Sequence, residues 1–516
     1  MTVFGTHVVC FVCCVVVSVR GTQPPFAQVS ELVRTAQRAE QAGNFEEAEG
    51  LYRDVLKVRP HWVPAEFRLA LLYQSQKKYP EAISLLTDIV THDPRMADAY
   101  LLRGEGYYEI DQYRKALASL QQAIRLRPKD AEAWFYVGAS HYQLHDYKRS
   151  ALAYLEQARL QPRQGKTYFQ LVQCYDALRN VIISQINRNK SASYFVLLLE
   201  AEKDSQHHDD VAADVQIEAA IATDLHAPEA WFIKAGQEEQ SKLSEAAKAD
   251  FERALQANAK DSPKFTSIID NEMRTHAHCV QAADLATALC RISNGNLAGA
   301  TNSVFAAVEE APDDVRTLYW ATRIYGRLIQ RAIAKVAEVS PDSPDLQKLY
   351  ARAFDENGQR AEAARRYEQA IALDDHDASS LIEYANFRSE AQEFEQAIAL
   401  LKKALTLTPY DYNVEILLAQ AYVHKGEPAP AVPYLADVLR IAPGNSQLRI
   451  DLAESLHSAS RTSEAIAVLE SAPDDPDGRV SYVLARFYAL EGEADKARVA
   501  REAFLSKQRQ ANQTVK

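Results

Sequence analysis

Residues 97–128 read ADAYLLRGEGYYEIDQYRKALASLQQAIRLRP, and this stretch decides the fold of the chain. Its large and small residues at helical spacing are Tyr100, Gly104, Tyr107, Ala116, Leu120 and Ala123. Residues three, four and seven apart share one face of a helix, so each half of the stretch is expected to be an amphipathic helix. Small residues let the two helices approach closely, and Pro128 stops the second one. The stretch therefore predicts a helical hairpin.

The hairpin recurs at a fixed interval. Four prolines stand 34 residues apart: Pro60, Pro94, Pro128 and Pro162. A unit of this length buries only one face by itself and becomes stable when the next unit stacks on it. The spacing therefore predicts a row of stacked hairpins with an elongated surface and no closed pocket.

The same pattern continues along most of the chain. Further members are Ala36, Ala48, Tyr52, Ala70, Tyr73, Ala82, Trp134, Gly138, Ala351, Phe354, Ala363, Tyr367, Ala385, Ala397, Leu401, Ala404, Ala419, Tyr422, Ala431, Leu435, Ala453, Ala465, Ala485, Tyr488, Ala497 and Phe504. This pattern resembles the tetratricopeptide repeat over about residues 29–504. The resemblance implies an all-α fold, a right-handed α-solenoid of antiparallel helix pairs with about a dozen repeats. Proteins of this family are used chiefly to hold other proteins.

The regularity of the spacing divides the chain. Residues 29–180 are expected to form an N-terminal repeat array and residues 344–507 a C-terminal one, followed by a polar tail at 508–516. In between, residues 181–343 keep helical periodicity but lose the hairpin spacing. We interpret this middle as degenerate repeats with longer or fused helices that bend the solenoid. A true domain break is the alternative.

Composition narrows the classes of partner. The chain has 516 residues with only 17 glycines, and its Ala, Leu, Glu and Arg content favours a nearly all-helical protein. Its formal net charge is -12, with acidic side chains interleaved among the basic ones. A nucleic-acid partner would require clustered Lys and Arg without those acids. The partners expected are therefore protein or peptide segments, and not nucleic acid.

The N-terminus carries a targeting signal. An apolar run from Val8 to Val19 is followed by Arg20, Gly21 and the Pro24-Pro25 pair. The run is shorter than the roughly 20 apolar residues of a membrane span, so residues 1–21 are interpreted as an export signal. The uncleaved anchor is the competing outcome, and it would be the chain's only link to a membrane. The chain is thus expected to be exported, whether periplasmic, secreted or membrane-anchored.

Three cysteines follow that segment: Cys174, Cys279 and Cys290. An odd count without a close pair does not make a disulfide framework. On one helix, Cys279 and Cys290 would lie about 16 Å apart, beyond disulfide reach. All three are therefore expected to be small core residues.

Several short motifs contain reactive atoms without the spacing that chemistry requires. The Gly165-Lys166-Thr167 sequence lacks the earlier glycine and the preceding strand of a phosphate-binding loop. Two groups hold metal-ligand atoms at unsuitable spacing, namely His276, His278 and Cys279, and His207, His208, Asp209 and Asp210. No paired-carboxylate site or nucleophile motif stands out. The sequence predicts a protein that is not an enzyme, with no catalytic residues, cofactor or metal.

The resemblance also points to a binding surface. In such repeats the first helix of each pair lines the inner groove, and its offsets select Phe67, Leu101, Glu105, Tyr108, Glu132, Phe135, Tyr142 and Phe169 in the first array. In the second array they select Lys348, Arg352, Ile382, Asn386, Asn413, Ile416, Gln420 and Ile450. Aromatic groove residues suit an extended, partly apolar peptide. Packing of these rings against neighbouring helices is the alternative.

Lys348 and Asn386 are similar to the residues with which chaperone adaptors of the family grip a carboxyl terminus. Arg352, Glu383 and Leu417 depart from that pattern, so the activity is not transferred. The prediction is an exported, non-catalytic scaffold. Its alternatives are an accessory subunit of a cell-envelope polysaccharide or protein secretion or assembly system, and an enzyme with a site in residues 181–280.

Overall fold

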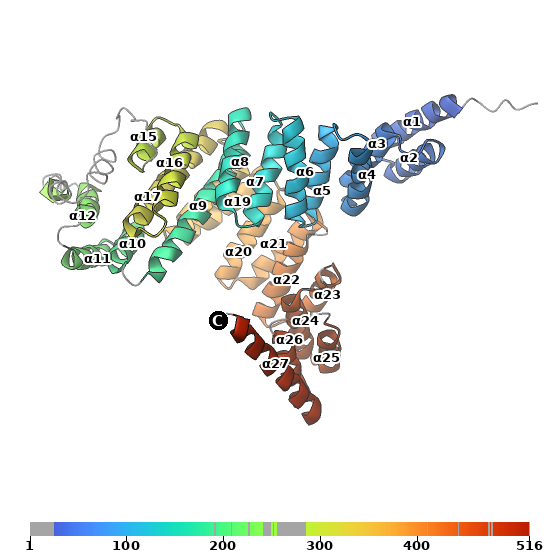
Figure 1. The fold of residues 1–516 in the computed structure, drawn as a ribbon. Coiled ribbons are helices and arrows are strands. Elements are labelled where there is room, and N and C mark those ends of the chain that lie inside the picture. The colour runs from blue at the N-terminus through green and yellow to red at the C-terminus, as the bar shows by residue number, and fades with distance from the viewer. Residues whose placement is uncertain are drawn as a thin grey trace, which may run out of the picture. The chain divides into compact units, whose positions relative to one another are not determined.

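The computed structural model describes residues 25–189, 192–207, 209–224, 228–240, 249–250, 252–254, 285–409, 411–441, 443–472, 475 and 478–514. Every secondary-structure element in these ranges is an α-helix (Figure 1), which confirms the predicted all-α fold. No helix in these ranges is long and apolar enough to cross a membrane. The predicted export signal at residues 1–21 lies outside the described residues.

The chain divides into two compact units, Met1–Pro162 and Arg163–Lys516. The helices of the first unit are α1 (Pro25–Gln41), α2 (Phe45–Val58), α3 (Val63–Ser75), α4 (Tyr79–His92), α5 (Ala97–Glu109), α6 (Tyr113–Leu126), α7 (Ala131–Gln143) and α8 (Tyr147–Leu160). They pack as four consecutive hairpins, α1 with α2, α3 with α4, α5 with α6, and α7 with α8. The second helix of each hairpin ends two residues before one of the four spaced prolines, as the sequence predicts.

Small residues set the distance between the helices of a hairpin. A Cβ atom added to Gly104 on α5 would lie 2.6 Å from Leu120 Cγ on α6. One added to Gly138 on α7 would lie 2.8 Å from the Tyr154 ring on α8. Glycine is therefore required at both positions, because any side chain would separate the paired helices.

The turns repeat as regularly as the helices. Within each hairpin of the first unit, one residue of the three-residue turn has a left-handed backbone: Gly43, Lys77, Asp111 and His145. These residues are 34 apart, as are Gly358, Gln392, Gly426 and Ser460 in the second unit. A left-handed residue after a helix satisfies its last carbonyl groups and reverses the chain. The shared backbone thus preserves the repeat where the side chain is not glycine.

The second unit contains longer helices as well as regular ones. Its helices are α9 (Gly165–Arg188), α10 (Ser193–Gln206), α11 (Asp210–Thr223), α12 (Pro228–Gln240), α15 (Leu285–Ser293), α16 (Leu297–Glu310), α17 (Val315–Val339), α18 (Pro344–Glu356), α19 (Arg360–Leu373), α20 (Ala378–Glu390), α21 (Phe394–Leu407), α22 (Tyr412–Lys425), α23 (Ala431–Ile441), α24 (Ser446–Ser458), α25 (Thr462–Glu470), α26 (Arg479–Leu490) and α27 (Ala494–Thr514). From α18 onward they form consecutive hairpins, α18 with α19 through α26 with α27.

One hairpin of this unit is made by helices far apart in the sequence. The α9 helix, with 24 residues, packs along α17, with 25, although residues 189–314 lie between them. A Cβ atom on Gly165, at the start of α9, would lie 2.4 Å from Ser340 Oγ, just after α17. The α9 helix also contacts α18, as α18 contacts α20 and α24 contacts α26. Residues 189–314 are therefore an insertion within one hairpin, which we call the split hairpin.

Buried polar contacts attach the insertion to α17. Glu229, at the start of α12, has no exposed surface and lies 2.7 Å from Arg316 Nε. It also accepts a hydrogen bond of 3.3 Å from Trp320 Nε1. One turn before its end, α10 contributes Glu202, which accepts a hydrogen bond from the Tyr319 hydroxyl at 2.7 Å. These two carboxylates bind polar side chains of α17 and so attach α10 and α12 to that helix.

The cysteines differ from the sequence prediction at one position. Cys174 is buried and free, as expected. Cys290 on α15 is buried, as expected, but it is also disulfide-bonded, which the sequence analysis did not predict. Cys279 lies outside the described residues.

Candidate functional site

In the first unit, the first helices of two successive hairpins, α5 and α7, lie side by side. The α5 helix contacts α7, whereas contacts between the corresponding second helices α6 and α8 are sparser. Because the first helices are closer together, they occupy the inner side of the stack. Side chains that point from α5 and α7 toward this side can therefore share one partner.

Aromatic rings form a continuous patch at this position. We call Tyr108, Tyr113, Phe135 and Tyr136 the aromatic cluster. The Tyr108 ring lies 5.6 Å from those of both Tyr113 and Tyr136, and Phe135 lies 5.4 Å from Tyr136, all in edge-to-face geometry. This geometry places the positive edge of one ring against the negative face of the next. The rings therefore hold one another in place before any ligand binds.

A carboxylate sits within the cluster. Glu105 on α5 is hydrogen-bonded to the Tyr136 hydroxyl on α7. Burial raises the pKa of Glu105, and the charges of Glu132 and Glu109 raise it further. Burial also raises the pKa of Tyr136, again with a contribution from nearby carboxylates. Burial and the neighbouring carboxylates thus disfavour the charged form of Glu105.

The charges that raise the pKa values of two cluster tyrosines and of Glu105 are carboxylates. Burial and the carboxylates Glu109 and Asp111 raise the pKa of Tyr108, and the Tyr108 hydroxyl is hydrogen-bonded to Gln143. Glu105 and Glu109 are four residues apart on α5, and Glu132 lies near the start of α7. Like charges gathered in one place favour a cation that can neutralise them.

Most predicted groove residues of the first unit are half-buried. Phe67, Glu105, Tyr108, Phe135 and Tyr142 all keep part of their surface exposed, and Glu132 is exposed. Leu101 differs, because it is buried among Ala116, Leu120 and other residues of the hairpin core. Leu101 therefore belongs to the hairpin core and does not line the predicted groove.

Three aromatic residues of this region were not singled out by the sequence offsets: Tyr113, Tyr136 and Tyr147. Tyr147 begins α8 and lies 5.2 Å, ring to ring, from Tyr142. Tyr113 begins α6 in the same way. Both follow a hairpin turn with a left-handed residue, and this shared position is the signal that could have identified them.

In the second unit, two of the predicted groove residues, Lys348 and Arg352, pair with carboxylates of the protein itself. Lys348 on α18 is 2% exposed, and its Nζ lies 2.9 Å from Asp345 Oδ1 and 3.3 Å from Asp377 Oδ2. Although burial disfavours the charged form, the carboxylates of Asp345, Glu383 and Asp377 raise the pKa of Lys348. This lysine is neutralised inside the protein and is not presented to a ligand carboxylate.

Phe169 on α9 lies under the same charges. It is buried, with Lys348 Nζ 4.9 Å and the Arg352 guanidinium 5.4 Å from its ring centre. Arg352 pairs with Glu383 on α20 at 2.8 Å. Asn386, Asn413 and Gln420 are exposed, Ile382 and Ile416 are half-buried, and Ile450 is buried. Phe169 and Lys348 therefore join α9, α18 and α20 instead of lining an open surface.

The motifs with reactive atoms have structural roles where they are described. Gly165 permits the close approach of α9 to Ser340, and Thr167 is buried. Asp209 caps α11 by accepting a hydrogen bond of 3.0 Å from the Ala212 amide. His207 ends α10, and its Nδ1 lies 2.7 Å from the Lys203 carbonyl oxygen. His208, His276, His278 and Cys279 lie outside the described residues.

Family models identify the repeat in several parts of the chain. Models described as tetratricopeptide repeats match residues 33–97, 388–432 and 425–480, and one described as a TPR repeat matches residues 104–144. Among solved structures, MamA is 26% identical over 27% of this chain and 82% of its own, with a TM-score of 0.27. A tetratricopeptide repeat protein from Parabacteroides merdae is 12% identical over 77% of this chain and 99% of its own, with a TM-score of 0.37. No curated protein matches the chain.

Proposed function

Because the chain is a tetratricopeptide repeat protein, we propose that it is a non-catalytic scaffold that binds protein segments along the first helices of its first unit. The observation that carries this proposal is the aromatic cluster with Glu105 at its centre. Protein binding is the general use of this fold, and the cluster supplies a specific surface for it.

The cluster has the properties of a binding hot spot. Large rings offer contact area, and their mutual packing lowers the entropy that a partner must overcome to order them. Its residues come from α5, α6 and α7, so an extended segment crossing these helices would meet several rings in turn. The half-buried Glu105 carboxylate adds a site for a hydrogen-bond donor or a cation.

Export is the finer part of the proposal. The apolar run at residues 8–19 supports it, and so does the disulfide at Cys290, because disulfides persist mainly in oxidising compartments. A reporter fused after residue 30 is expected to leave the cytoplasm. Its retention there would contradict export, and a membrane-bound full-length product would replace secretion with anchoring.

Binding is tested with partners captured by cross-linking in the native source, each then measured against the purified chain. The double variant Phe135→Ala with Tyr142→Ala is expected to weaken binding by about 2 kcal/mol, the hot-spot scale. Thermal stability should fall little, since both rings are half-buried. The control is Phe45→Ala, which removes an aromatic ring from α2 that is 42% exposed. Severe unfolding with residual affinity intact would move the binding surface elsewhere.

A further inference from the structure

One position of the hairpin holds a large, buried side chain in most of the hairpins that the structure describes, but not in the hairpin of α26 and α27. It lies four residues after the small residue of the second helix, and its occupants are Tyr52, Leu86, Leu120, Tyr154, Val304, Tyr367, Leu401, Leu435 and Leu469. All of these are at most 5% exposed. Four residues after Ala497, on α27, the chain has Arg501, which is exposed. The last hairpin therefore lacks the side chain that fills the others.

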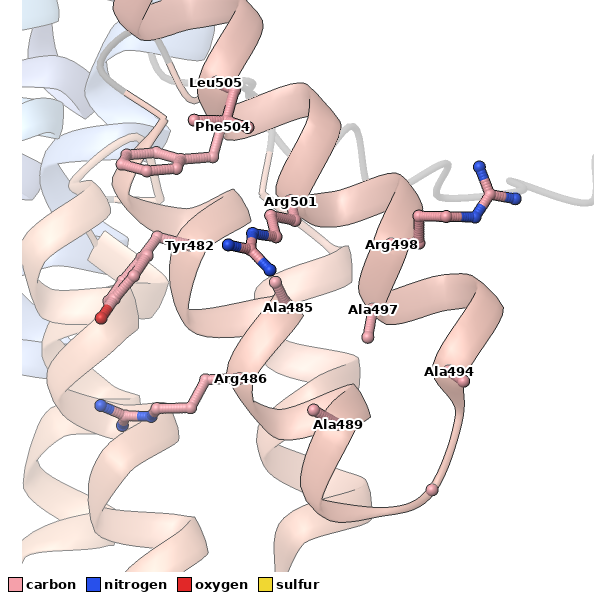
Figure 2. A pocket seen from close by; sticks show the side chains of 11 residues that line it. Tyr482, Ala485, Arg486, Ala489, Ala494, Ala497, Arg498, Arg501, Phe504 and Leu505 are labelled. Atoms are coloured by element: carbon pink, nitrogen blue, oxygen red, sulfur yellow. The ribbon is translucent and has the colours of Figure 1, made fainter.

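A pocket of about 680 Å³ lies where that side chain is missing. Its lining includes alanines from both helices, Ala485 and Ala489 on α26 and Ala494 and Ala497 on α27. Figure 2 shows these alanines facing the space between the two helices, with the Arg501 side chain reaching across toward Ala485. Larger residues that line the pocket are Tyr482, Phe504 and Leu505.

The preceding hairpin shows what covers this face when it is covered. In α24 and α25, the positions that correspond to Tyr482, Ala485, Ala497 and Arg501 are Ile450, Ala453, Ala465 and Leu469, all at most 6% exposed. They share one core with residues of α26, which contacts both helices. In the last hairpin, Tyr482 is 53% exposed. The occupant that fits this face is therefore a helix and not an extended strand.

Charge specifies that helix further. Neighbouring first helices in this unit are joined by arginine–glutamate pairs, Arg352 with Glu383 at 2.8 Å and Arg486 with Glu454 at 2.8 Å. On α27, Arg498 already pairs with Glu502 at 3.2 Å. Arg501 makes no ion pair within the described part of the chain. Although Arg501 is on a second helix and those pairs join first helices, a carboxylate on the incoming helix would give it an ion pair of the same kind.

We propose that the face of α26 and α27 around this pocket binds an amphipathic helix of a partner protein. A large apolar side chain of that helix fills the pocket, and a carboxylate at the edge of its apolar face pairs with Arg501. This surface is separate from the aromatic cluster and adds a second kind of partner, helical instead of extended. On this face Tyr482 is 53% and Leu505 43% exposed, an apolar surface that a partner helix would cover.

The test uses the full chain and two synthetic helical peptides. Both carry leucines three and four residues apart on one face, and the edges of that face carry glutamates in one peptide and lysines in the other. Fluorescence anisotropy is expected to show at least about ten-fold tighter binding of the glutamate peptide. Equal affinities, or no binding of either peptide, would overturn the proposal.

Variants locate the binding. Arg501→Leu restores the residue type of the other hairpins, so it should fill the pocket, weaken peptide binding about ten-fold and stabilise the last hairpin. Arg501→Glu should reverse the preference between the two peptides. The control Arg509→Glu makes the same charge change on α27 outside the pocket and should leave the preference intact.

Sedimentation of the chain alone tests whether a second copy of the chain covers this face. If the parent chain forms dimers and Arg501→Leu is monomeric, a second copy of the chain covers this face. That result would overturn the choice of a different partner protein. If neither Arg501→Leu nor Arg501→Glu changes the affinity for the glutamate peptide, the peptide does not bind at the pocket, and the proposal is overturned. A monomer whose peptide binding follows Arg501 supports the proposal.

Discussion

The regular hairpins and the split hairpin reach the same packing by different connections. In α5 and α6 the helices have 13 and 14 residues and are joined by a three-residue turn. In the split hairpin the helices have 24 and 25 residues and are separated by residues 189–314. Both kinds of hairpin present a first helix to the next first helix. The stack therefore depends on covered faces and not on the length of a connection.

Chain entropy explains why such an insertion is tolerated. Closing a flexible loop becomes less favourable by about 0.6 kcal/mol for each doubling of its length, so extending a short turn to this insertion would cost about 3 kcal/mol. The added turns of α9 and α17 offset this cost, because they bury residues such as Tyr319, Trp320 and Ile324. The Phe195 ring on α10 packs 5.2 Å from that of Tyr319. The insertion is thus held by the same helices that it separates.

The largest effect is expected in a regular hairpin. Ala397 on α21 has no exposed surface, so Ala397→Asp would place a charge in a tight helix contact. We expect a loss of about 4 to 5 kcal/mol, with unfolding that begins among the helices after α18. Denaturant unfolding monitored by circular dichroism measures it. Ala399→Asp, at an exposed position of the same helix, is the control, and equal stability of the two variants would contradict the hairpin register.

The split hairpin should fail in a more local way. Glu229→Ala leaves Arg316 and Trp320 without their buried partner, and we expect a loss of about 3 kcal/mol. Hydrogen exchange should rise in α10 to α12, while α9 and the second half of α17 stay protected. Glu218→Ala, which removes a largely exposed carboxylate from α11, is the control. Equal exchange throughout α9 to α17 would show that the insertion and the split hairpin unfold as one.

A smaller effect is expected where the split hairpin meets α18. Lys348→Met leaves Asp345 and Asp377 without their cation. Because both carboxylates are partly exposed, we expect the free energy of unfolding to fall by about 2 kcal/mol. The Asp377 pKa is lowered: burial opposes this, but hydrogen bonds from Ser380 and Lys348 outweigh it. Its ionised form therefore contributes stability above the ordinary aspartate pKa, which is lost as the pH falls through the lower folded pKa.

In Lys348→Met the folded pKa of Asp377 rises toward its unfolded value, so the part of the acid-induced loss of stability that this carboxylate causes should become smaller than in the parent chain. Thermal melts between pH 2 and pH 6 would show it. Lys403→Met, which removes an exposed lysine from α21, should leave the acid profile unchanged. An unchanged profile in Lys348→Met would mean that the lysine does not hold this carboxylate in its charged form.

The sequence predicted the regular hairpins because all their signals are local. Spaced prolines and small residues lie within one unit, so the position of each hairpin follows from the residues of that hairpin alone. The split hairpin has no such signal, since the partner of α9 lies beyond residues 189–314. The same separation explains why the burial of Phe169 was not predicted. Lys348, which covers its ring, comes from α18, a helix that is distant from α9 in the sequence and adjacent to it only in space. Half of the aromatic cluster was predicted for the opposite reason, because Tyr108 and Phe135 lie at fixed offsets on consecutive hairpins.

The smallest effect on stability is expected when the insertion is removed, which converts the split hairpin into a regular one. The end of α9 and the start of α17 are close, since Gln185 Nε2 donates to the Pro312 carbonyl oxygen at 2.9 Å. A short glycine-containing turn in place of residues 189–314 should therefore let the two helices form an ordinary hairpin. Tyr319 and Trp320 would be replaced by serine and glutamine, because the deletion uncovers them.

The helices from α18 onward should then melt within a few degrees of the parent chain, because each hairpin couples mainly to its neighbours. Limited proteolysis and circular dichroism of the shortened chain measure this. The matched control deletes α20 and α21 instead, which removes a hairpin whose residues belong to the core of that array. If the shortened chain loses the array and the control keeps it, the insertion is a necessary part of the stack and not an addition to it.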